Sequence, residues 1–393
     1  MLMNLVYVIW LLLCTLFLGV PSIQFIYLQL ARRKPEKFSS DENYFPSITI
    51  LVPTYNEANV IEYKLENLYE LKYPRTLIQI IVVDSGSTDG TLNKVSKFTK
   101  NHPDICVKIL KEEKRGGKSK ALNFALKYAT GDVIIVSDAD SFLPSDMLLE
   151  SLPKLNDPFV GAISGREVFL NLNSSWVTVS EEHYLKFMDV IKEGESKIHS
   201  TIFFEGGFSA YKRKYLDSFD DKTGSDDCGT ALDIVQKGVR TIFVPEAEFY
   251  TIFPTTLRGK LAIKIRRSNQ LVRVWMKCLR LMLSRKLLLP KRIAVFEIFS
   301  FLVNPLIFAL LLFTTVILVL QCLLLSIIFL LILLSPLLIS RIRFLFLNGI
   351  QSYFILLTAL LALAFGKKFT VWEIPVERKR LLTREMLENK DLI

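Results

Sequence analysis

Residues 131–140 read Gly-Asp-Val-Ile-Ile-Val-Ser-Asp-Ala-Asp, and this stretch decides the fold. Its four consecutive β-formers, Val133 to Val136, predict a strand buried on both faces, as in a parallel sheet covered by helices. The strand leads into Asp138 and Asp140, whose carboxylates would then face the crevice where open α/β sheets bind ligands. Hard oxygen ligands at this spacing suit Mg²⁺ or Mn²⁺ carrying a diphosphate. A solvated turn would explain the same two acids, so other parts of the chain must decide.

The composition indicates membrane segments joined to a charged domain. Of the 393 residues, 51% are hydrophobic and 22% charged, and the mean hydropathy is +0.34. The net charge is +10, and Lys and Arg alternate with apolar residues between 257 and 292, where no acid occurs. This pattern predicts a basic amphipathic segment on anionic lipid and argues against nucleic-acid binding. Five cysteines without a Cys-x-x-Cys pair and three histidines without ligand spacing predict neither a disulfide framework nor a zinc site.

Both ends of the chain carry apolar runs. Residues 1–30 contain no charge and are followed by Arg32, Arg33 and Lys34, which predicts a retained anchor with the following domain in the cytoplasm. Further uncharged stretches indicate two to three spans between residues 293 and 366. An anchor plus three spans would put the basic tail outside, against the positive-inside rule. Alternatively, one run is interfacial or re-entrant and the tail is cytoplasmic.

Strands and helices alternate in the first half of the central region. Strands are expected at 48–52, 77–83, 107–110 and 133–136, and helices at 60–71, 88–100 and 119–129, the second of them capped by Ser87 or Thr88. This succession predicts an α/β fold with a doubly wound, mainly parallel sheet.

Three later features carry polar groups that a ligand could use. Gly116-Gly117-Lys118 precedes a helix and could approach a phosphate, although a flexible turn explains it equally well. After a strand at 161–169 and a helix at 177–192, Gly206-Gly207 lies between aromatic residues. Asp226 and Asp227 open the next helix, where the helix dipole explains Asp226 but a second acid is harder to explain by capping.

These motifs together resemble the membrane-anchored family 2 glycosyltransferases, which include the cellulose, chitin and hyaluronan synthases and related lipid glycosyltransferases. The resemblance covers about residues 46–275. Its motifs are Val52-Pro53-Thr54-Tyr55-Asn56-Glu57, Val83-Asp84-Ser85-Gly86-Ser87-Thr88-Asp89-Gly90-Thr91, Gly117-Lys118-Ser119-Lys120-Ala121-Leu122-Asn123, Asp138-Ala139-Asp140, Gly206-Gly207 and Asp226-Asp227.

The resemblance implies a GT-A-type enzyme that uses a nucleotide-diphospho-sugar. The donor-binding residues it implies are Pro53, Tyr55, Glu57 and Asp84 around the nucleobase and ribose, Lys118 at the diphosphate, and Asp138 at the nucleotide end. It places Mg²⁺ or Mn²⁺ on Asp140, together with Asp138. It makes Asp227 the general base that deprotonates an acceptor hydroxyl, so that attack opposite the leaving group inverts the anomeric centre. The acceptor-side candidates are Gly206, Gly207, Asp226, Arg266 and Arg267.

One departure concerns the acceptor. The polymer synthases carry Gln-x-x-Arg-Trp after the base, and the matching place here is Lys264-Ile265-Arg266-Arg267-Ser268. The nearby Gln270-Leu271-Val272-Arg273-Val274-Trp275 has one extra residue before the Trp. Either the register is shifted or the Trp that holds the acceptor is missing, which puts processive synthesis in doubt.

The sequence therefore predicts an integral membrane enzyme with a cytoplasmic GT-A domain. The expected segments are an anchor at 1–30, a linker at 31–45, the glycosyltransferase domain at 46–256, an interfacial segment at 257–292, a transmembrane region at 293–366 and a tail at 367–393. The expected reaction transfers a hexosyl or N-acetylhexosaminyl group, preferably from a UDP-sugar, to a lipid-linked or membrane-proximal glycan acceptor. The alternatives are a processive polysaccharide synthase and a non-catalytic nucleotide-sugar-binding scaffold.

Overall fold

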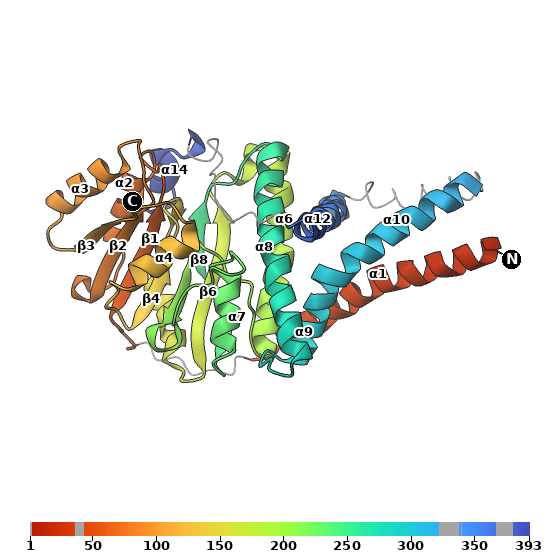
Figure 1. Cartoon of the computed structure of the whole chain (residues 1–393). Helices are drawn as coiled ribbons and strands as arrows, with labels where there is room; N and C mark the ends of the chain where they lie inside the picture. The colour runs from red at the N-terminus through yellow and green to blue at the C-terminus, as the bar shows by residue number, and fades with distance from the viewer. Residues whose placement is uncertain (1, 36–42, 322–337, 339, 367–379) are drawn as a thin grey trace.

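The fold is given by a computed structural model, which describes residues 2–35, 43–321, 338, 340–366 and 380–393. A sheet domain forms one end of the molecule (Figure 1). Two long helices, α6 (Trp176–Ile198) and α8 (Leu257–Leu283), stand along its side. Beyond them, α1 (Leu2–Arg32) and α10 (Asn304–Gln321) extend away from the sheet.

The sheet contains eight strands in the order β3-β2-β1-β4-β7-β6-β8-β5. Their bounds are β1 Ile48–Thr54, β2 Ile78–Asp84, β3 Cys106–Lys111, β4 Val133–Val136, β5 Ser141–Phe142, β6 Val160–Phe169, β7 Ser209–Lys212 and β8 Arg240–Thr251. The first four strands pair in parallel, as the alternation of strands and helices predicts. Strand β7 is antiparallel to both β4 and β6, while β6 and β8 are again parallel. The prediction of a mainly parallel α/β sheet is confirmed.

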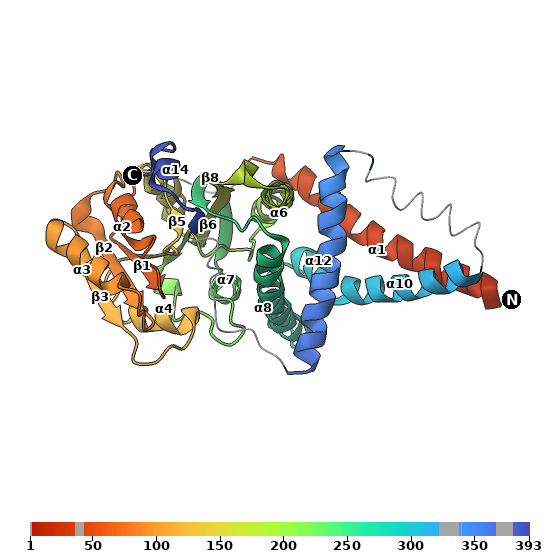
Figure 2. The same cartoon turned by 90° about the horizontal axis from the view of Figure 1, so that it is seen from above.

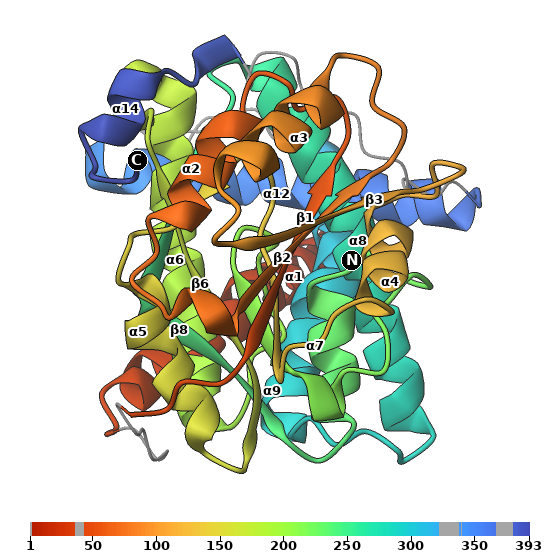
Figure 3. The same cartoon turned by 90° about the vertical axis from the view of Figure 1, so that its left-hand side faces the viewer.

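Helices cover both faces of the sheet, and Figure 3 shows β1 and β2 passing between α2 and α4. The helices of the sheet domain are α2 Ile61–Tyr69, α3 Thr91–Asn101, α4 Lys118–Leu126, α5 Met147–Ser151 and α7 Cys228–Val235, with short 3-10 turns at Arg75–Leu77, Leu152–Asn156, Leu172–Ser174 and Arg213–Tyr215. Strand side chains alternate between two apolar clusters: Leu51 and Ile134 join one, and Ile50 and Ile135 the other. This alternation explains why the strands read as continuous apolar runs.

Helix α3 begins later than the sequence suggests. Its cap is Gly90, at φ +90°, and neither Ser87 nor Thr88 caps it. The Ser87 hydroxyl is engaged elsewhere, because it donates to Asp84 and accepts from the Asn56 N–H at 2.8 Å. The predicted cap was therefore wrong, since the turn that follows β2 binds its own side chains.

In the part of the chain that the structure describes, three helices are long and apolar enough to cross a membrane: Leu5–Arg32, Lys291–Leu320 and Phe346–Ala364. The second joins α9 (Lys291–Ile298) to α10 through a π-helical turn at Phe299–Val303. Helices α1 and α10 run side by side, whereas α12 (Ser340–Ala364) crosses them beside α8 (Figure 2).

A buried polar cluster fixes α12 against α6 and α8. Asn348 of α12 accepts from the Lys260 ammonium at 2.7 Å and donates to the Ser180 carbonyl at 2.6 Å. Buried polar groups need such partners, so this helix is docked on α6 and α8 by specific contacts.

The carboxyl-terminal segment returns to the sheet domain. Helix α14 (Arg384–Glu388) buries Leu387, and Leu392 follows it, both packed against Phe142 of β5. The Asn67 side chain of α2 donates to the Leu392 carbonyl at 2.7 Å. The described end of the tail, residues 380–393, therefore lies against the sheet domain. Of the basic tail residues, Lys367, Lys368, Arg378 and Lys379 lie outside the described residues.

Candidate active site

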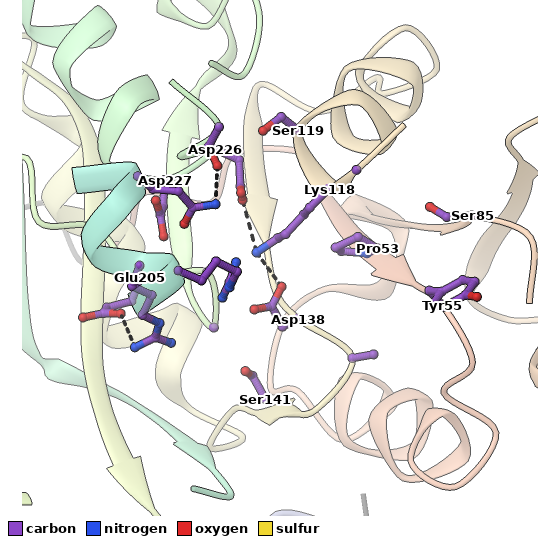
Figure 4. A pocket seen from close by; sticks show the side chains of 18 of the residues that line it. Pro53, Tyr55, Ser85, Lys118, Ser119, Asp138, Ser141, Glu205, Asp226 and Asp227 are labelled. Atoms are coloured by element: carbon purple, nitrogen blue, oxygen red, sulfur yellow. Dashed lines mark hydrogen bonds and ion pairs between the residues drawn. The ribbon is translucent and has the colours of Figure 1, made fainter. Parts of the chain in front are cut away.

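A cavity of about 330 Å³ opens where β1 and β4 end. Every site residue proposed from the sequence lines it except Asp84: Pro53, Tyr55, Glu57, Lys118, Asp138, Asp140, Gly206, Gly207, Asp226, Asp227, Arg266 and Arg267. Figure 4 shows Pro53, Tyr55 and Ser85 on one wall and Glu205 and Asp227 on the opposite wall, with Lys118 between them. The structure thus brings motifs separated by more than 200 residues of sequence into one site.

The first wall offers a flat aromatic surface. The Arg115 guanidinium lies 3.6 Å from the centroid of the Tyr55 ring, a cation–π arrangement. Asp84 lies behind this wall, where its carboxylate accepts from the N–H groups of Gly86 at 3.1 Å and Ser87 at 3.0 Å. Asp84 therefore shapes the turn that carries Ser85 into the cavity. Its contact with a donor stays a prediction.

Lys118 is the central cation of the site. Its ammonium lies 2.7 Å from Asp138 Oδ1 and 3.1 Å from Asp226 Oδ2, so it joins the end of β4 to the segment before α7 (Figure 4). Burial lowers the pKa of Lys118, but the carboxylates of Asp138, Asp226 and Asp227 outweigh burial and hold it above its ordinary value. Because Gly117 before it has φ +97°, the chain can turn there and start α4 with Lys118 in the cavity.

Gly206 and Gly207 are required by close packing. A Cβ on Gly206 would meet the Lys118 ammonium and come within 2.9 Å of Asp138 Oδ2. A Cβ on Gly207 would strike the Phe249 ring. Side-chain packing around the cavity therefore explains why both positions are glycine, which the sequence did not suggest. The contact of Gly206 and Gly207 with an acceptor stays a prediction.

Asp138 and Asp140 fit a divalent cation that is shared with a substrate. Both acids line the cavity just after β4, and Asp138 is one-third exposed. The residues that the structure describes contain no group of three or more His, Cys, Asp or Glu side chains able to hold a metal alone. Two carboxylates are what Mg²⁺ or Mn²⁺ needs when phosphate oxygens and water complete its shell.

The capping residue of α7 is the second of the two acids that precede the helix, and its role as the general base stays a prediction. Asp227 is the cap: its Oδ1 accepts from the Cys228 N–H at 2.7 Å and from the Ser225 hydroxyl at 2.6 Å. Asp226, which the dipole argument explained as a capping residue, instead pairs with Lys118. Burial raises the pKa of Asp226 to about 6, with Asp227 and Asp138 adding to the shift against Lys118. The correction has a simple cause, since Lys118 comes from a part of the chain more than 100 residues away.

Helix α8 supplies a row of cations on the side of the cavity near the membrane helices. Arg267 lies 3.8 Å from Glu167 and 4.0 Å from Glu205, and these acids raise the pKa of its guanidinium above the ordinary value although burial acts against them. Burial and the neighbouring Arg267 lower the pKa of Arg266 to about 10. This row can hold negative charge or sugar hydroxyls that enter from the membrane side.

Arg273 and Gln270 line the cavity and were missed as site residues. Arg273 is 8% exposed, and its two terminal nitrogens have no hydrogen-bond partner among the described residues. The Gln270 amide donates to the Gly224 carbonyl at 2.6 Å. The sequence did indicate both residues, because Gln270 and Arg273 have the Gln-x-x-Arg spacing that begins the Gln-x-x-Arg-Trp signature.

Trp275 lies in the core and outside this cavity. It is fully buried, and its ring lies 5.9 Å from that of Phe301 and 5.8 Å from that of Phe203. One extra residue turns a helical position by about 100° around the axis. The extra residue before Trp275 therefore points the indole away from the side of α8 that carries Gln270 and Arg273.

Comparison with known proteins gives a consistent picture. The model described as "Glycosyl transferase family 2" matches residues 49–219. The poly-beta-1,6-N-acetyl-D-glucosamine synthase of Staphylococcus aureus (strain MSSA476) is 28% identical over 257 residues, which cover 63% of this chain and 60% of the relative. The beta-monoglucosyldiacylglycerol synthase of Nostoc sp. is 27% identical over 240 residues, which cover 60% of this chain and 50% of the relative. The chain thus matches about half to three-fifths of the length of these curated relatives.

Among solved structures, the mannosyltransferase PcManGT from Pyrobaculum calidifontis, in complex with GDP-Man and Mn²⁺, is similar over nearly the whole chain. The TM-score is 0.81 at 30% sequence identity, and the match covers 92% of this chain and 100% of that one. Because the match covers nearly the whole chain, the predicted GT-A-type fold is confirmed.

Proposed function

Because the chain belongs to glycosyl transferase family 2, we propose that it inverts an anomeric centre while moving a sugar from a nucleotide-diphosphate donor to a membrane-proximal acceptor. The observation that carries this proposal is the position of Lys118, between Asp138 on the donor side and Asp226 beside the predicted base, Asp227. A binding module would need no carboxylate opposite its nucleotide wall. We therefore favour an enzyme over a scaffold.

The proposed mechanism gives each wall of the cavity one task. Tyr55 and Pro53 hold the nucleoside, which orients the donor with its diphosphate toward Lys118 and Arg273. Asp227 accepts the proton of the acceptor hydroxyl as that oxygen attacks the anomeric carbon from the face opposite the diphosphate. Lys118 and Arg273 then hold the negative charge that develops on the leaving diphosphate. Asp138 and Asp140 would hold a divalent cation, which would supply further positive charge to the leaving diphosphate.

The donor sugar is proposed from the solved relative. The Pyrobaculum mannosyltransferase was solved with GDP-Man, which makes GDP-mannose the first donor to test in place of the UDP-sugar that the sequence suggested. The cavity offers the Tyr55 ring and the Arg115 guanidinium to any nucleobase. A UDP-linked hexose or N-acetylhexosamine is the second choice, in line with the sugar in the name of the staphylococcal relative.

The proposed acceptor is a lipid or a lipid-linked glycan at the cytoplasmic face. The basic helix α8 and the crossing helix α12 lie between the cavity and the helices α1 and α10, so an acceptor in the membrane surface would reach the site from their side (Figure 1). Arg33 and Lys34 follow α1 directly and the described tail lies on the sheet domain, which favours a cytoplasmic position for that domain.

A second candidate function is the synthesis of a polymer. It is favoured by the name of the staphylococcal relative, a poly-N-acetyl-glucosamine synthase. Against it, Trp275 is buried in the core and no longer available to hold an acceptor chain. We therefore place single addition first.

The test is nucleotide release by the detergent-purified full chain with Mn²⁺ or Mg²⁺, across GDP- and UDP-linked sugars, with and without a membrane lipid extract. The proposal predicts release from one donor, increased by the extract, and a labelled lipid product with one added sugar. A ladder of products would establish the polymer synthase instead. Absence of release from every donor, with the extract present, would contradict the proposed activity.

A further inference from the structure

Helix α2 presents two polar side chains beneath the turn that carries Asp138 and Asp140. Lys64 and Asn67 are three residues apart, so they lie on the same face of the helix. Both are buried, Lys64 completely and Asn67 to 1% exposure. Neither belongs to the motifs that the proposed function uses, and neither lines the cavity.

Lys64 ties the two ends of this turn together. Its ammonium donates to the Ser137 hydroxyl at 2.7 Å and to the Ser141 carbonyl at 2.5 Å. Ser137 in turn donates to the Gly207 carbonyl at 2.8 Å. The Lys64 amine nitrogen thus binds both Ser137, which precedes Asp138, and Ser141, which follows Asp140.

Asn67 holds the next part of the same segment and connects it to the end of the chain. Its amide oxygen accepts from the Leu143 N–H at 2.9 Å, and its amide nitrogen donates to the carbonyls of Leu143 and Leu392, both at 2.7 Å. Leu387 and Leu392 also pack on Phe142. The carboxyl-terminal segment, residues 380–393, therefore clamps the strand that follows Asp140.

A buried lysine costs free energy that an apolar residue would not, so its presence calls for a function. Burial lowers the pKa of Lys64 to about 7, while Asp138 and Asp140 act against this shift. The amine donates two hydrogen bonds in either protonation state. Its hold on the turn therefore does not depend on its charge.

We propose that Lys64 is a positioning residue that sets the Asp138–Asp140 turn for a divalent cation, and that Asn67 with the carboxyl-terminal segment locks the same turn. This inference rests on the proposed metal-dependent transfer. It makes cation affinity depend on residues that touch neither the cation nor the sugar donor.

The test is Mn²⁺ binding to the full chain, followed by the electron paramagnetic resonance signal of free Mn²⁺, alone and with GDP or UDP. We expect Lys64→Met to raise the Mn²⁺ Kd at least tenfold, and Asn67→Ala or removal of residues 391–393 to raise it three- to tenfold. The control is Lys94→Met, which removes a surface pair with Glu62 on the outer side of the same helix and should leave the Kd within twofold. In turnover assays, excess Mn²⁺ should restore most of the kcat of Lys64→Met.

A folded Lys64→Met protein with an unchanged Mn²⁺ Kd would overturn the inference. If Lys64→Met does not fold, Ser137→Ala removes one of its two acceptors with a smaller change in volume, and an unchanged Kd there would overturn it equally. A wild-type chain that turns over donor but binds no Mn²⁺ would overturn the metal role of the turn, and this inference with it, while leaving the transferase itself standing. A wild-type chain that binds Mn²⁺ without turnover would contradict the proposed activity alone.

Discussion

Replacing Gly206 with alanine should separate activity from stability. The φ of Gly206 lies outside the left-handed region, so alanine fits its backbone, but the new Cβ would meet the Lys118 ammonium and approach Asp138 Oδ2 to 2.9 Å. The Lys118 side chain can move away at small cost, because it is flexible and 24% exposed. The free energy of unfolding should then fall by less than about 1 kcal/mol, as for a partly exposed ion pair.

The activity should fall much further. A lysine displaced from Asp138 can no longer hold the leaving diphosphate, and a charged hydrogen bond contributes about 1.5–3 kcal/mol. This corresponds to a loss of about ten- to 150-fold in kcat/KM, at 1.36 kcal/mol for each factor of ten. The assay is nucleotide release with the donor identified by the scan, beside thermal unfolding of the same preparation.

A double-mutant cycle shows whether the effect acts through Lys118. If it does, Gly206→Ala should add almost nothing to the loss already caused by Lys118→Met. The control is Gly349→Ala in α12, where no described residue outside the helix's own backbone lies within 4 Å of the new Cβ and kcat/KM should not change. A Gly206→Ala enzyme within twofold of wild type, or full additivity with Lys118→Met, would refute the reasoning.

Three further outcomes follow from the structure. Burial raises the pKa of Asp226 to about 6, so kcat/KM should fall as the pH drops below about 6, because the protonated carboxyl loses its ion pair with Lys118. The pH–rate profile of Asp226→Asn should lack this acidic fall, and a fall that persists in the variant would contradict its assignment to Asp226. Burial and the Glu297 carboxylate raise the pKa of Glu195 well above 4.5, so the folded state binds the Glu195 proton more tightly than the unfolded state does, and stability should fall as the pH rises above about 4.5. Glu195→Gln should flatten the dependence of the unfolding temperature on pH, and an unchanged slope would count against a role of Glu195 in this dependence. Trp275→Ala, as a core substitution, should lower the free energy of unfolding by about 3–5 kcal/mol and leave the acceptor KM of the folded protein unchanged. A raised acceptor KM without a loss of stability would instead show that Trp275 holds the acceptor.

The sheet was predictable because its strands are short apolar runs that end in turn residues. Ile48–Val52 and Val133–Val136 are buried on both faces, and such short runs between turn residues are typical of strands, since buried helices are longer. The Asp138-Ala139-Asp140 motif could be placed for the same reason, since it directly follows one of these strands. The local sequence pattern was therefore sufficient to predict those elements whose position depends only on the burial of their side chains.

Contacts between distant parts of the chain were not predictable. The ion pair of Asp226 depends on Lys118, which reaches it from helix α4. The hydrogen bond from Asn67 to Leu392 joins residues 325 positions apart. Nothing in the local sequence of either partner signals such a contact.

The membrane region shows the same limit. Composition identified the apolar runs, and the structure places α12 across α1 and α10 through the contacts of Asn348 with Lys260 and Ser180 (Figure 2). The described tail lies beside the sheet domain, and the number of membrane spans stays a prediction. Hydropathy cannot distinguish a crossing helix from a spanning one, because both expose apolar side chains to lipid.

The measurement that tests the central claim most directly compares donor binding and turnover in Asp227→Asn. Asparagine keeps the shape of the side chain and can still accept from the Cys228 N–H, so the fold and the donor site should persist. The account predicts donor affinity within about threefold of wild type and a loss of about 10²–10⁴-fold in kcat, as expected when a general base is removed. Turnover that survives in Asp227→Asn would contradict the assignment of the base and with it the proposed mechanism.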